Sequence, residues 1–302
     1  MNKLFFFKDL DDHYVLNIAG ISLSIKHKSR FQYKKALEYG LETNKRCPQL
    51  IVCLTTHPAR INYVHYAINT LLRQNLKPDK VILWLAREQF PKGEGELPQQ
   101  LLHLKDLGLS IEWCEDLKSY KKLVPALLMY PNDIIVTADD DVYYEEDVLK
   151  SLYNAYQNNT NNIYVRRSVR LNFENGNIKY ISSRRYFYKH ILEPSYFNQL
   201  MGGSACLYPP HSLYKDVVNI EQIQKLIPTH DDVYFWAMAV LNKTKIQVVK
   251  GFEANLYFVQ EAQDTGLIHL NQSGQTGIAL EDAYKVMIKE YPEILKILKS
   301  EI

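Results

Sequence analysis

The sequence predicts an α/β fold in which a mostly parallel central sheet is flanked by helices. From Leu50 onward, short apolar runs alternate with segments of helical periodicity, as in parallel strands joined by crossover helices. The apolar runs have little polar interruption, which is typical of strands buried on both faces. A chain of 302 residues with 46% hydrophobic content is long and apolar enough to build such a core.

The elements of this core follow one another regularly. The expected strands lie at residues 50–55, 80–86, 111–114 and 134–136, and the expected helices at residues 62–74 and 121–129. Parallel strands in this order place their carboxyl ends at one edge of the sheet, where open α/β sheets bind ligands.

Both ends of the chain lie outside this alternation. Residues 14–26 alternate around Gly20 and predict a small N-terminal β-hairpin. From Leu280 to Ile302, apolar residues recur at helical spacing, and Pro292 divides this tail. We therefore divide the chain into an N-terminal hairpin and connector (1–47), a main α/β domain (48–270) and a C-terminal helical tail packed on the core (271–302).

Charge and cysteine content exclude several classes of protein. Lys+Arg 36 against Asp+Glu 34 gives a formal net charge of +2, without the basic excess of a dedicated nucleic-acid binder. The four cysteines show no C-x-x-C spacing, which argues against a zinc site or a disulfide framework. No stretch reaches the roughly 18 apolar residues of a membrane span, and the apolar patch at residues 4–7 is too short for a signal peptide. We expect a cytoplasmic protein that does not bind nucleic acid.

A basic stretch follows the hairpin. It contains His27, Lys28, Arg30, Lys34 and Lys35. Because it lacks a clear amphipathic pattern, we interpret it as a solvated connector. The alternative is a membrane-surface patch, which would place the protein peripherally at the inner face of the cytoplasmic membrane.

Three consecutive carboxylates follow the apolar run at residues 134–136. They are Asp139, Asp140 and Asp141, and they leave the strand at its carboxyl end. Two aspartates at positions i and i+2 can turn their oxygens toward one hard cation, such as Mn²⁺ or Mg²⁺, which in turn can hold a diphosphate. The alternative is a structural turn in which one acid caps the following helix, but a cap does not explain three adjacent acids.

Loops after two other strands carry groups that suit a nucleotide diphosphate. The first strand is followed by Thr55 to Arg60, and the third by Asp116 with Lys121 and Lys122 close behind. Such a ligand needs polar partners for its base and ribose and a positive side chain near its phosphates. Further along the chain, Gly202-Gly203 precedes an apolar run, so backbone can approach a bound sugar closely there, although a simple turn into a strand is the alternative.

These features together form a recognisable pattern. The Thr-Thr-x-Pro-x-Arg turn at residues 55–60, an Asp after the third strand, the Lys-Leu-x-Pro-Ala-Leu helix at residues 122–127 and the Asp-Asp-Asp-Val-Tyr segment occur in that order. The pattern resembles bacterial metal-dependent glycosyltransferases of the GT-A fold, and most of all the family 2 type that uses nucleotide sugars. The resemblance covers about residues 48–270 and implies a GT-A-like, Rossmann-like domain.

The resemblance implies a role for each residue that matches a family motif. Asp141 would ligate the metal, and Asp139 would contact the ribose, the metal or a water bound to it. Asp140, the middle acid of this D-x-D element, belongs to the nucleotide-sugar site, but the resemblance assigns it no specific contact. Asp116 matches the acid that contacts the nucleobase. Thr55, Pro58 and Arg60 match the nucleotide-binding turn that opens the family's domain. Lys122 matches a contact to the phosphate or the sugar. For Arg60 and Lys122, a surface charge at the start of a helix is the alternative. Gly202 and Gly203 match the glycine-rich segment at the donor sugar.

The Asp231-Asp232 pair resembles the acidic pair that supplies the general base of inverting transferases. A sugar hydroxyl has a high pKa, so a carboxylate must accept its proton as it attacks the anomeric carbon. We favour Asp232 as the base, with Asp231 as the alternative; a pair that only caps the helix is the structural interpretation. The resemblance also suggests that His269 completes the metal shell, although a histidine between Ile268 and Leu270 is more often a packed strand residue.

The expected function is transfer of a sugar from a nucleotide diphosphate sugar, a UDP-sugar by resemblance, to a hydroxyl acceptor with inversion. The resemblance suggests a glycan or glycolipid acceptor and a role in bacterial lipopolysaccharide or capsule assembly. Two alternatives remain. A nucleotidyltransferase also uses paired aspartates and a metal but normally needs a glycine-rich basic loop after its first strand, which residues 55–60 are not. A non-catalytic glycan-binding protein is the other.

Overall fold

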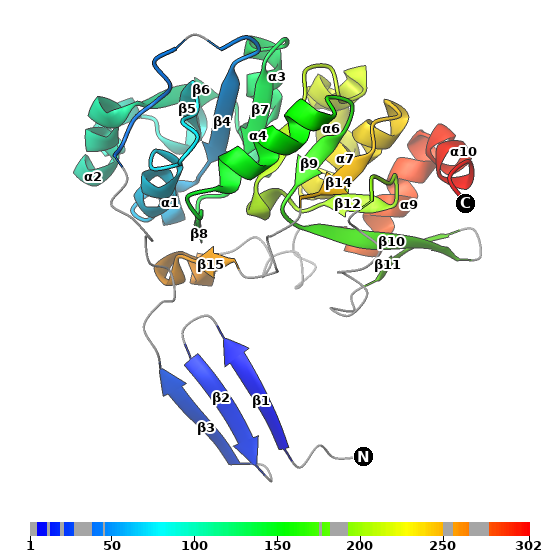
Figure 1. Ribbon diagram of the computed structural model, residues 1–302, viewed down its shortest axis with the longest axis horizontal. Helices are drawn as coiled ribbons and strands as arrows, with labels where there is room; N and C mark the ends of the chain where they lie inside the picture. The colour runs from blue at the N-terminus through cyan, green and yellow to red at the C-terminus, as the bar shows by residue number, and fades with distance from the viewer. Residues whose placement is uncertain are drawn as a thin grey trace.

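The centre of the molecule is one large sheet. Figure 1 shows the computed structural model, which describes residues 5–10, 13–18, 21–26, 38–44, 46–174, 177–181, 193–249, 256–265 and 278–302. The large sheet has seven strands in the order β14-β9-β13-β7-β4-β5-β6. They are β4 (Leu50–Thr55), β5 (Lys80–Ala86), β6 (Leu109–Cys114), β7 (Ile134–Thr137), β9 (Ile163–Val165), β13 (Cys206–Tyr208) and β14 (Ile246–Val248).

Most of these strands run parallel. β4 pairs in parallel with β5 and β7, β5 pairs with β6, and β9 pairs with β14. Only β13 is antiparallel to its two neighbours, β7 and β9, among the strands of this sheet. The α/β fold with a mostly parallel central sheet that the sequence predicts is therefore confirmed.

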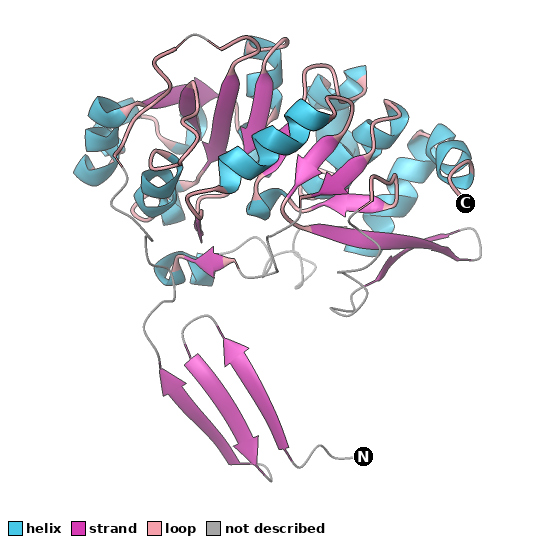
Figure 2. Cartoon of the chain, viewed as in Figure 1, coloured by secondary structure: helices cyan, strands magenta, loops and turns pink. Residues whose placement is uncertain are grey.

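Helices cover both faces of the sheet, as Figure 2 shows in cyan against the magenta strands. On one face, Leu50, Val52 and Leu54 belong to a hydrophobic cluster with helices α1, α2 and α4. On the other face, Ile51 and Cys53 belong to a cluster with α3, α6, α7, α9 and α10. The helices are α1 (Val64–Leu71), α2 (Gln99–Leu102), α3 (Val124–Met129), α4 (Val148–Asn158), α6 (Ile220–Leu226), α7 (Asp231–Leu241), α9 (Leu280–Glu290) and α10 (Glu293–Lys299).

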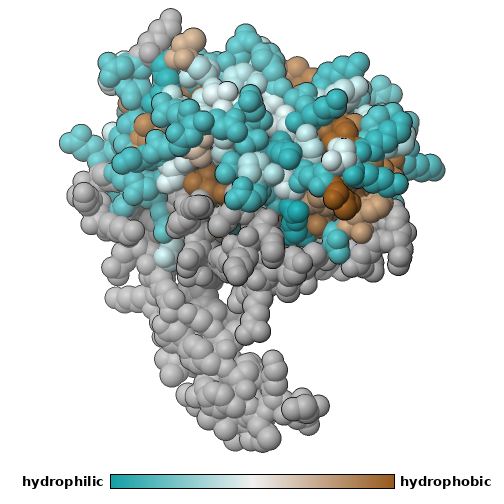
Figure 3. All heavy atoms as spheres, turned by 45° about the vertical axis from the view of Figure 1, so that its right-hand side comes forward, coloured by the Kyte–Doolittle hydropathy of each residue, from teal (hydrophilic) through white to brown (hydrophobic). Residues whose placement is uncertain are grey.

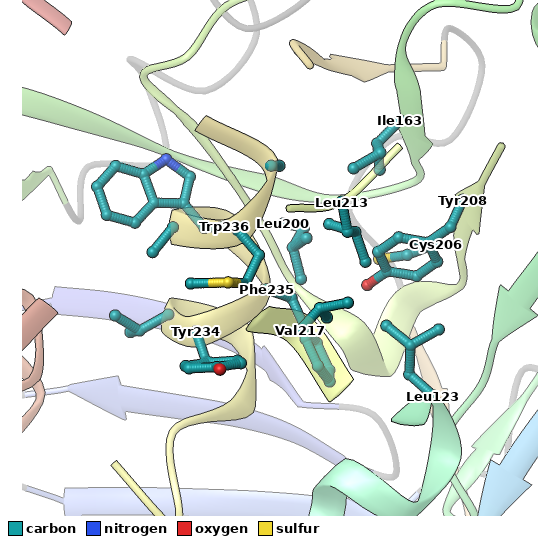
Figure 4. Packing of buried hydrophobic residues seen from close by; sticks show 14 of the residues in the cluster. Leu123, Ile163, Leu200, Cys206, Tyr208, Leu213, Val217, Tyr234, Phe235 and Trp236 are labelled. Atoms are coloured by element: carbon teal, nitrogen blue, oxygen red, sulfur yellow. The ribbon is translucent and has the colours of Figure 1, made fainter. Parts of the chain in front are cut away.

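Helix α7 lies inside the second cluster. Its residues from Val233 to Val240 are all buried, which is typical of a helix that packs on every side. Figure 4 shows Phe235 and Trp236 of this helix in the cluster with Leu200 and Val217. The first turn of α7 is thereby held rigidly, which matters because that turn carries the predicted acidic pair.

The strand order reverses beside β4. The chain passes from β4 to β5 and β6 on one side, and then returns to form β7 on the other side of β4. In open α/β sheets, ligands bind at the carboxyl ends of the strands where the order reverses in this way. We therefore expect a ligand-binding site at the loops that follow β4 and β7.

Some elements differ from the sequence prediction. The expected strands at 50–55 and 80–86 coincide with β4 and β5. The expected helix at 121–129 is instead a 3₁₀ turn, η5 (Lys118–Lys122), followed by α3, in which Pro125 lies near the start. Proline lacks an amide hydrogen and suits the first turn of a helix, so the helix begins just before Pro125.

Three smaller sheets surround the core. The predicted N-terminal hairpin is present as β2 (His13–Ile18) and β3 (Ile21–Lys26), and β1 (Phe5–Leu10), which was not predicted, adds a third antiparallel strand. A second antiparallel sheet contains β10 (Ser168–Glu174), β11 (Asn177–Ile181) and β12 (Asn198–Leu200). The third pairs β8 (Val142–Tyr143) with β15 (Tyr257–Phe258). At the C-terminus, Pro292 separates α9 from α10, as predicted.

The surface of the described part is mostly hydrophilic on the face shown in Figure 3, where hydrophobic side chains form separate spots. The exposed large hydrophobic residues are Tyr66, Leu128, Met129, Leu280 and Ile302. Within the described residues, none of the helices has both the length and the apolar character needed to cross a membrane.

The packing of α7 predicts a large cost for truncating Trp236. This side chain is fully buried, its ring lies 5.7 Å from that of Tyr284, and its indole N–H donates to the Tyr196 carbonyl at 2.8 Å. We expect Trp236→Ala to lower the free energy of unfolding by about 3–5 kcal/mol in urea titrations. Leu128→Ala is the control, because Leu128 is 58% exposed; its cost should stay within about 0.5 kcal/mol. Equal costs for the two variants would contradict this description of the core.

Candidate functional site

The three consecutive aspartates lie at the carboxyl end of β7, beside the loop that follows β4. The Ala138 amide still bonds to the Cys53 carbonyl of β4 at 2.9 Å, and the chain leaves the sheet directly afterwards. The position predicted for the acids is therefore observed, at the edge where the strand order reverses. Their side chains then separate into two groups.

Asp140 and Asp141 face the turn after β4. Arg60 ends the short 3₁₀ helix η1 (Pro58–Arg60), and its Nη1 lies 2.7 Å from Oδ1 of Asp140 and 3.1 Å from Oδ2 of Asp141. The Thr56 hydroxyl donates to the other oxygen of Asp140 at 2.5 Å. Because Arg60 is buried and paired, the interpretation of it as a surface charge is wrong. Pro58 begins η1 and so fixes the shape of the turn.

Two threonines of this turn have different partners. The Thr55 hydroxyl donates to the Trp84 carbonyl of β5 at 2.8 Å, so it bonds within the sheet. Thr56, which the sequence analysis did not select, is the one that reaches the acids. Adjacent side chains of an extended strand point in opposite directions, so only one of the two threonines could face the acids. This alternation was the only feature of the sequence that could have indicated Thr56.

Asp139 faces the opposite way, toward Lys122 and the start of α7. The Lys122 ammonium lies 2.9 Å from Oδ1 of Asp139 and 3.0 Å from Oδ2 of Asp231. Lys122 is only 5% exposed. Burial alone would lower the pKa of Lys122, but the nearby carboxylates of Asp139 and Asp231 raise it well above its usual value. Lys122 is therefore a buried, charged link, and the interpretation of it as a surface charge is wrong.

The acidic pair lies in the first turn of α7. Ser119 donates to Oδ1 of Asp231 at 2.9 Å, and the Gly202 amide donates to Oδ1 of Asp232 at 2.9 Å. The N-cap residue is His230, and its side chain makes no capping bond. The structural interpretation, in which the pair only caps the helix, is therefore wrong, because both acids lie inside the helix and His230 occupies the N-cap position. In that first turn, the helix dipole favours negative charge.

The predicted glycines allow the two acidic segments to come close. Gly202 and Gly203 form the 3₁₀ turn η6 (Gly202–Ser204) between β12 and β13. A Cβ atom on Gly202 would lie 2.7 Å from the Lys122 ammonium, and one on Gly203 would lie 2.6 Å from Oδ2 of Asp139. Any side chain at either position would therefore push against the charged groups.

Negative charge exceeds positive charge in this cluster. Within the described residues, two cations, Arg60 and Lys122, are paired with the acids of the triplet and of α7, which are Asp139, Asp140, Asp141, Asp231 and Asp232. Desolvation, with repulsion from Asp139 and Asp140, raises the pKa of Asp141 to about 6. Desolvation, with repulsion from Asp231, raises the pKa of Asp232 to about 7. A bound cation would relieve this repulsion.

Asp116 follows β6 at the same edge of the sheet. It accepts hydrogen bonds from the Lys118 amide at 3.0 Å and from Gln89 at 3.1 Å, and Lys121 lies 3.2 Å away. Burial opposes these contacts, but together they lower the pKa of Asp116, so the carboxylate stays charged. Gln89 and Lys121 also bond to each other at 3.0 Å. Gln89 was not predicted, because its partner Asp116 lies 27 residues away, after the next strand.

Two further side chains and one backbone amide reach the acids of the triplet. Gln263, in the 3₁₀ helix η8 (Gln260–Thr265), donates to Oδ2 of Asp141 at 3.2 Å, and the Val259 amide donates to the Asp141 carbonyl at 2.7 Å. The buried Tyr144 hydroxyl accepts from the Asp139 amide at 2.7 Å. Neither Gln263 nor Tyr144 was selected from the sequence.

The donor chemistry of the triplet fits a hard divalent cation. Asp139 and Asp141 offer anionic oxygens, which Mg²⁺ and Mn²⁺ prefer. Within the described residues, three or more carboxylate, histidine or cysteine groups do not converge on one point as in an all-protein metal cage. Mg²⁺ in phosphate-processing enzymes commonly uses one or two carboxylates and completes its shell with phosphate oxygens and water. His269, the other predicted ligand, lies outside the described residues.

Comparisons with known proteins give only distant similarities. No protein-family model matches the chain, and neither does any curated protein. Among solved structures, S. aureus TarS 1-349 is 16% identical, with 83% of this chain and 70% of that chain covered and a TM-score of 0.48. The complex of the same protein with UDP is 15% identical, with coverages of 69% and 59% and a TM-score of 0.44. A cytidylyltransferase from Leptospira borgpetersenii is 13% identical, with coverages of 82% and 95% and a TM-score of 0.40. The fold assignment rests on the strand order described above.

The raised pKa of Asp232 predicts that stability depends on pH. Its value of about 7 in the folded protein lies above the ordinary 3.8, so the folded state binds the proton more tightly than the unfolded chain does. The resulting stabilisation is complete below about pH 4 and is lost as the pH rises through about 7. We expect Asp232→Asn to show a smaller fall in the free energy of unfolding between pH 5 and pH 8 than the wild type, in urea titrations with EDTA. The control Asp106→Asn, at an exposed site, should keep the wild-type fall. An unchanged fall in Asp232→Asn would mean that Asp232 is already ionised at pH 5.

Proposed function

We propose that this protein is a metal-dependent glycosyltransferase that moves a sugar from a nucleotide diphosphate donor, a UDP-sugar, to a hydroxyl group of an acceptor. The observation that carries the proposal is the double contact of Lys122 with Asp139 and Asp231. It brings the acidic end of β7 and the acidic first turn of α7 into one site at the reversal of the strand order. A sugar transfer needs a group that holds the donor diphosphate close to a base that activates the acceptor hydroxyl. The end of β7 would supply the first group and the first turn of α7 the second.

The donor would lie across the carboxyl ends of β4, β6 and β7. Asp116 would accept a hydrogen bond from the base, since its charged carboxylate is held at the edge of the site. The turn at residues 55–60 would border the nucleotide. Lys122 would face the diphosphate, because it is the buried cation between the two acidic segments. The backbone of the Gly202-Gly203 turn would border the donor sugar, since the charged groups of Lys122 and Asp139 occupy the space that side chains there would need.

Asp141 would hold a Mn²⁺ or Mg²⁺ ion together with the diphosphate, and Asp139 would join it by turning its carboxylate from Lys122 toward the Asp141 side of the triplet. When bound, this ion offsets the negative charge that develops on the departing diphosphate. The protein contributes a rigid strand end, from which the acids emerge, and the pairing of Arg60 with Asp140 and Asp141. Arg60 thereby orients one side of the triplet.

Asp232 is the better placed of the two candidate bases. Asp231 is held through both oxygens, by Ser119 and by Lys122, and its side chain is 12% exposed. Asp232 accepts one backbone bond, from Gly202, and has a raised pKa of about 7, close to that of an effective general base at neutral pH. It would take the proton from the acceptor hydroxyl as that oxygen attacks the anomeric carbon. Attack from the face opposite the diphosphate gives inversion.

The acceptor would be a glycan or glycolipid of the bacterial surface, such as lipopolysaccharide or capsule, with the protein in the cytoplasm or held peripherally at the membrane. This part of the proposal rests on the family resemblance. A nucleotidyltransferase is the runner-up, and it fits less well because a 3₁₀ helix that begins with proline, η1, takes the place of a glycine-rich phosphate loop after β4. A glycan-binding protein without activity would neither hydrolyse nor transfer a nucleotide sugar.

The donor class can be tested without knowledge of the acceptor. In a thermal-shift screen of nucleotide diphosphates and sugar nucleotides, we expect UDP and UDP-sugars to raise the Tm only when Mn²⁺ is present. Asp141→Asn should remove most of this shift, because a neutral amide is a poor ligand for a hard cation. Asp106→Asn should keep it, because Asp106 is an exposed acid in a separate 3₁₀ helix, His103–Leu107. The metal assignment fails if wild type and Asp141→Asn respond alike with and without Mn²⁺.

The catalytic base can be separated from the donor site by a second pair of variants. Asp232→Asn should bind donor as the wild type does and lower transfer by about 10²-fold or more, the usual contribution of a positioned base. Asp231→Asn should lower transfer less. Asp282→Asn, an acid in the first turn of α9, controls for helix-dipole effects. The opposite ranking of the first two variants would assign the base to Asp231, and full activity in both would make the pair structural.

A further inference from the structure

The Tyr144 hydroxyl joins two backbone segments of the candidate site. It accepts a hydrogen bond from the Asp139 amide at 2.7 Å and donates to the Gly203 carbonyl at 3.2 Å. A second acceptor, the Asp139 carbonyl, is farther away at 3.5 Å, so the single hydroxyl hydrogen is better placed toward Gly203. One side chain therefore connects the end of β7 with the glycine turn before β13.

This connection occurs where the sheet no longer supplies hydrogen bonds. The last ladder bond on this side of β7 comes from the Ala138 amide, and Asp139 is the first residue beyond it. Its amide needs a partner, since burying an unpaired N–H group is costly. Tyr144 supplies that partner. At the same place, Oδ2 of Asp139 fills the space where Gly203 would otherwise carry a side chain.

Tyr144 is itself held firmly. Its side chain is fully buried in the cluster between the sheet and helices α1 and α4, and its amide donates to the Thr70 hydroxyl of α1 at 3.0 Å. A tyrosine hydroxyl has an ordinary pKa of about 10, so it keeps its proton at neutral pH and remains a donor. A rigid, protonated hydroxyl fixes the distance between the two segments it joins.

We infer that Tyr144 is a positioning residue, which holds Asp139 and the Gly202-Gly203 turn in one arrangement so that the metal-bound diphosphate and the donor sugar are aligned. The inference rests on the proposed function for the identity of the ligands. Tyr144 does not touch the ligands in this arrangement; it acts through the backbone of residues that do. Partners of this kind, one step removed from a metal, commonly change metal affinity by about 10–100-fold.

The test is Tyr144→Phe, which keeps the ring and removes the hydroxyl. We expect the Kd for UDP at a limiting Mn²⁺ concentration to rise about tenfold, while the Kd at saturating Mn²⁺ changes less than about twofold. Tyr143→Phe is the matched control, because Tyr143 is the adjacent tyrosine, is partly exposed and makes no contact proposed for the site; it should leave both values unchanged. A loss of Tm in Tyr144→Phe with an unchanged ratio of the two Kd values would show a purely structural role and overturn the inference.

A second measurement needs no variant and no ligand. In the wild-type protein, hydrogen exchange followed by NMR should show the Asp139 amide protected, although it lies beyond the last ladder bond of β7. Exchange at the rate of an unprotected amide overturns the inference, even if the protein binds UDP and Mn²⁺. If the wild type binds neither, the proposed function fails instead, and the exchange result still decides whether Tyr144 holds Asp139. The exchange experiment also decides the matter if Tyr144→Phe does not fold.

Discussion

The contact of one buried ammonium with two carboxylates holds the candidate site together. Lys122 lies between Asp139, at the end of β7, and Asp231, at the start of α7. A buried lysine is stable as a cation only when anionic partners offset its desolvation, and these two acids do so. Without that cation, both acidic segments would face each other unopposed. The approach of α7 to the sheet edge and the charge of Lys122 therefore depend on each other.

The fold brings these groups together for simple reasons. The strand order reverses beside β4, so the loops after β4 and β7 diverge and leave their polar groups at one edge. Helix α7 is apolar along almost its whole length and packs into the core, which fixes its charged first turn near that edge. Gly202 and Gly203 complete the arrangement, because their missing side chains leave room for Lys122 and Asp139.

The sequence was sufficient to predict the parts of the structure that local pattern determines. Buried apolar runs located β4 and β5 to the residue and placed the acidic triplet at a carboxyl end. Pairings between distant segments were not predictable in this way. Local pattern does not show that Lys122 pairs with Asp231, more than 100 residues away along the chain. Nor does it show that Thr56, and not Thr55, bonds to Asp140. The interpretation of the acidic pair as helix caps is wrong because α7 begins at Asp231, which leaves His230 at the N-cap position.

The incomplete charge balance at this edge is the physical argument for the proposed metal ion and diphosphate. The pKa values of Asp141 and Asp232 are raised because desolvation and neighbouring acids are only partly offset by Arg60 and Lys122. A divalent cation would offset the repulsion on the Asp141 side, and the diphosphate that accompanies it would restore negative charge next to Lys122. Because the acids of the cluster outnumber Arg60 and Lys122 among the described residues, a bound cation would also reduce the repulsion between these acids and an entering diphosphate. This charge balance is the electrostatic support for the proposal that nucleotide binding depends on a metal ion.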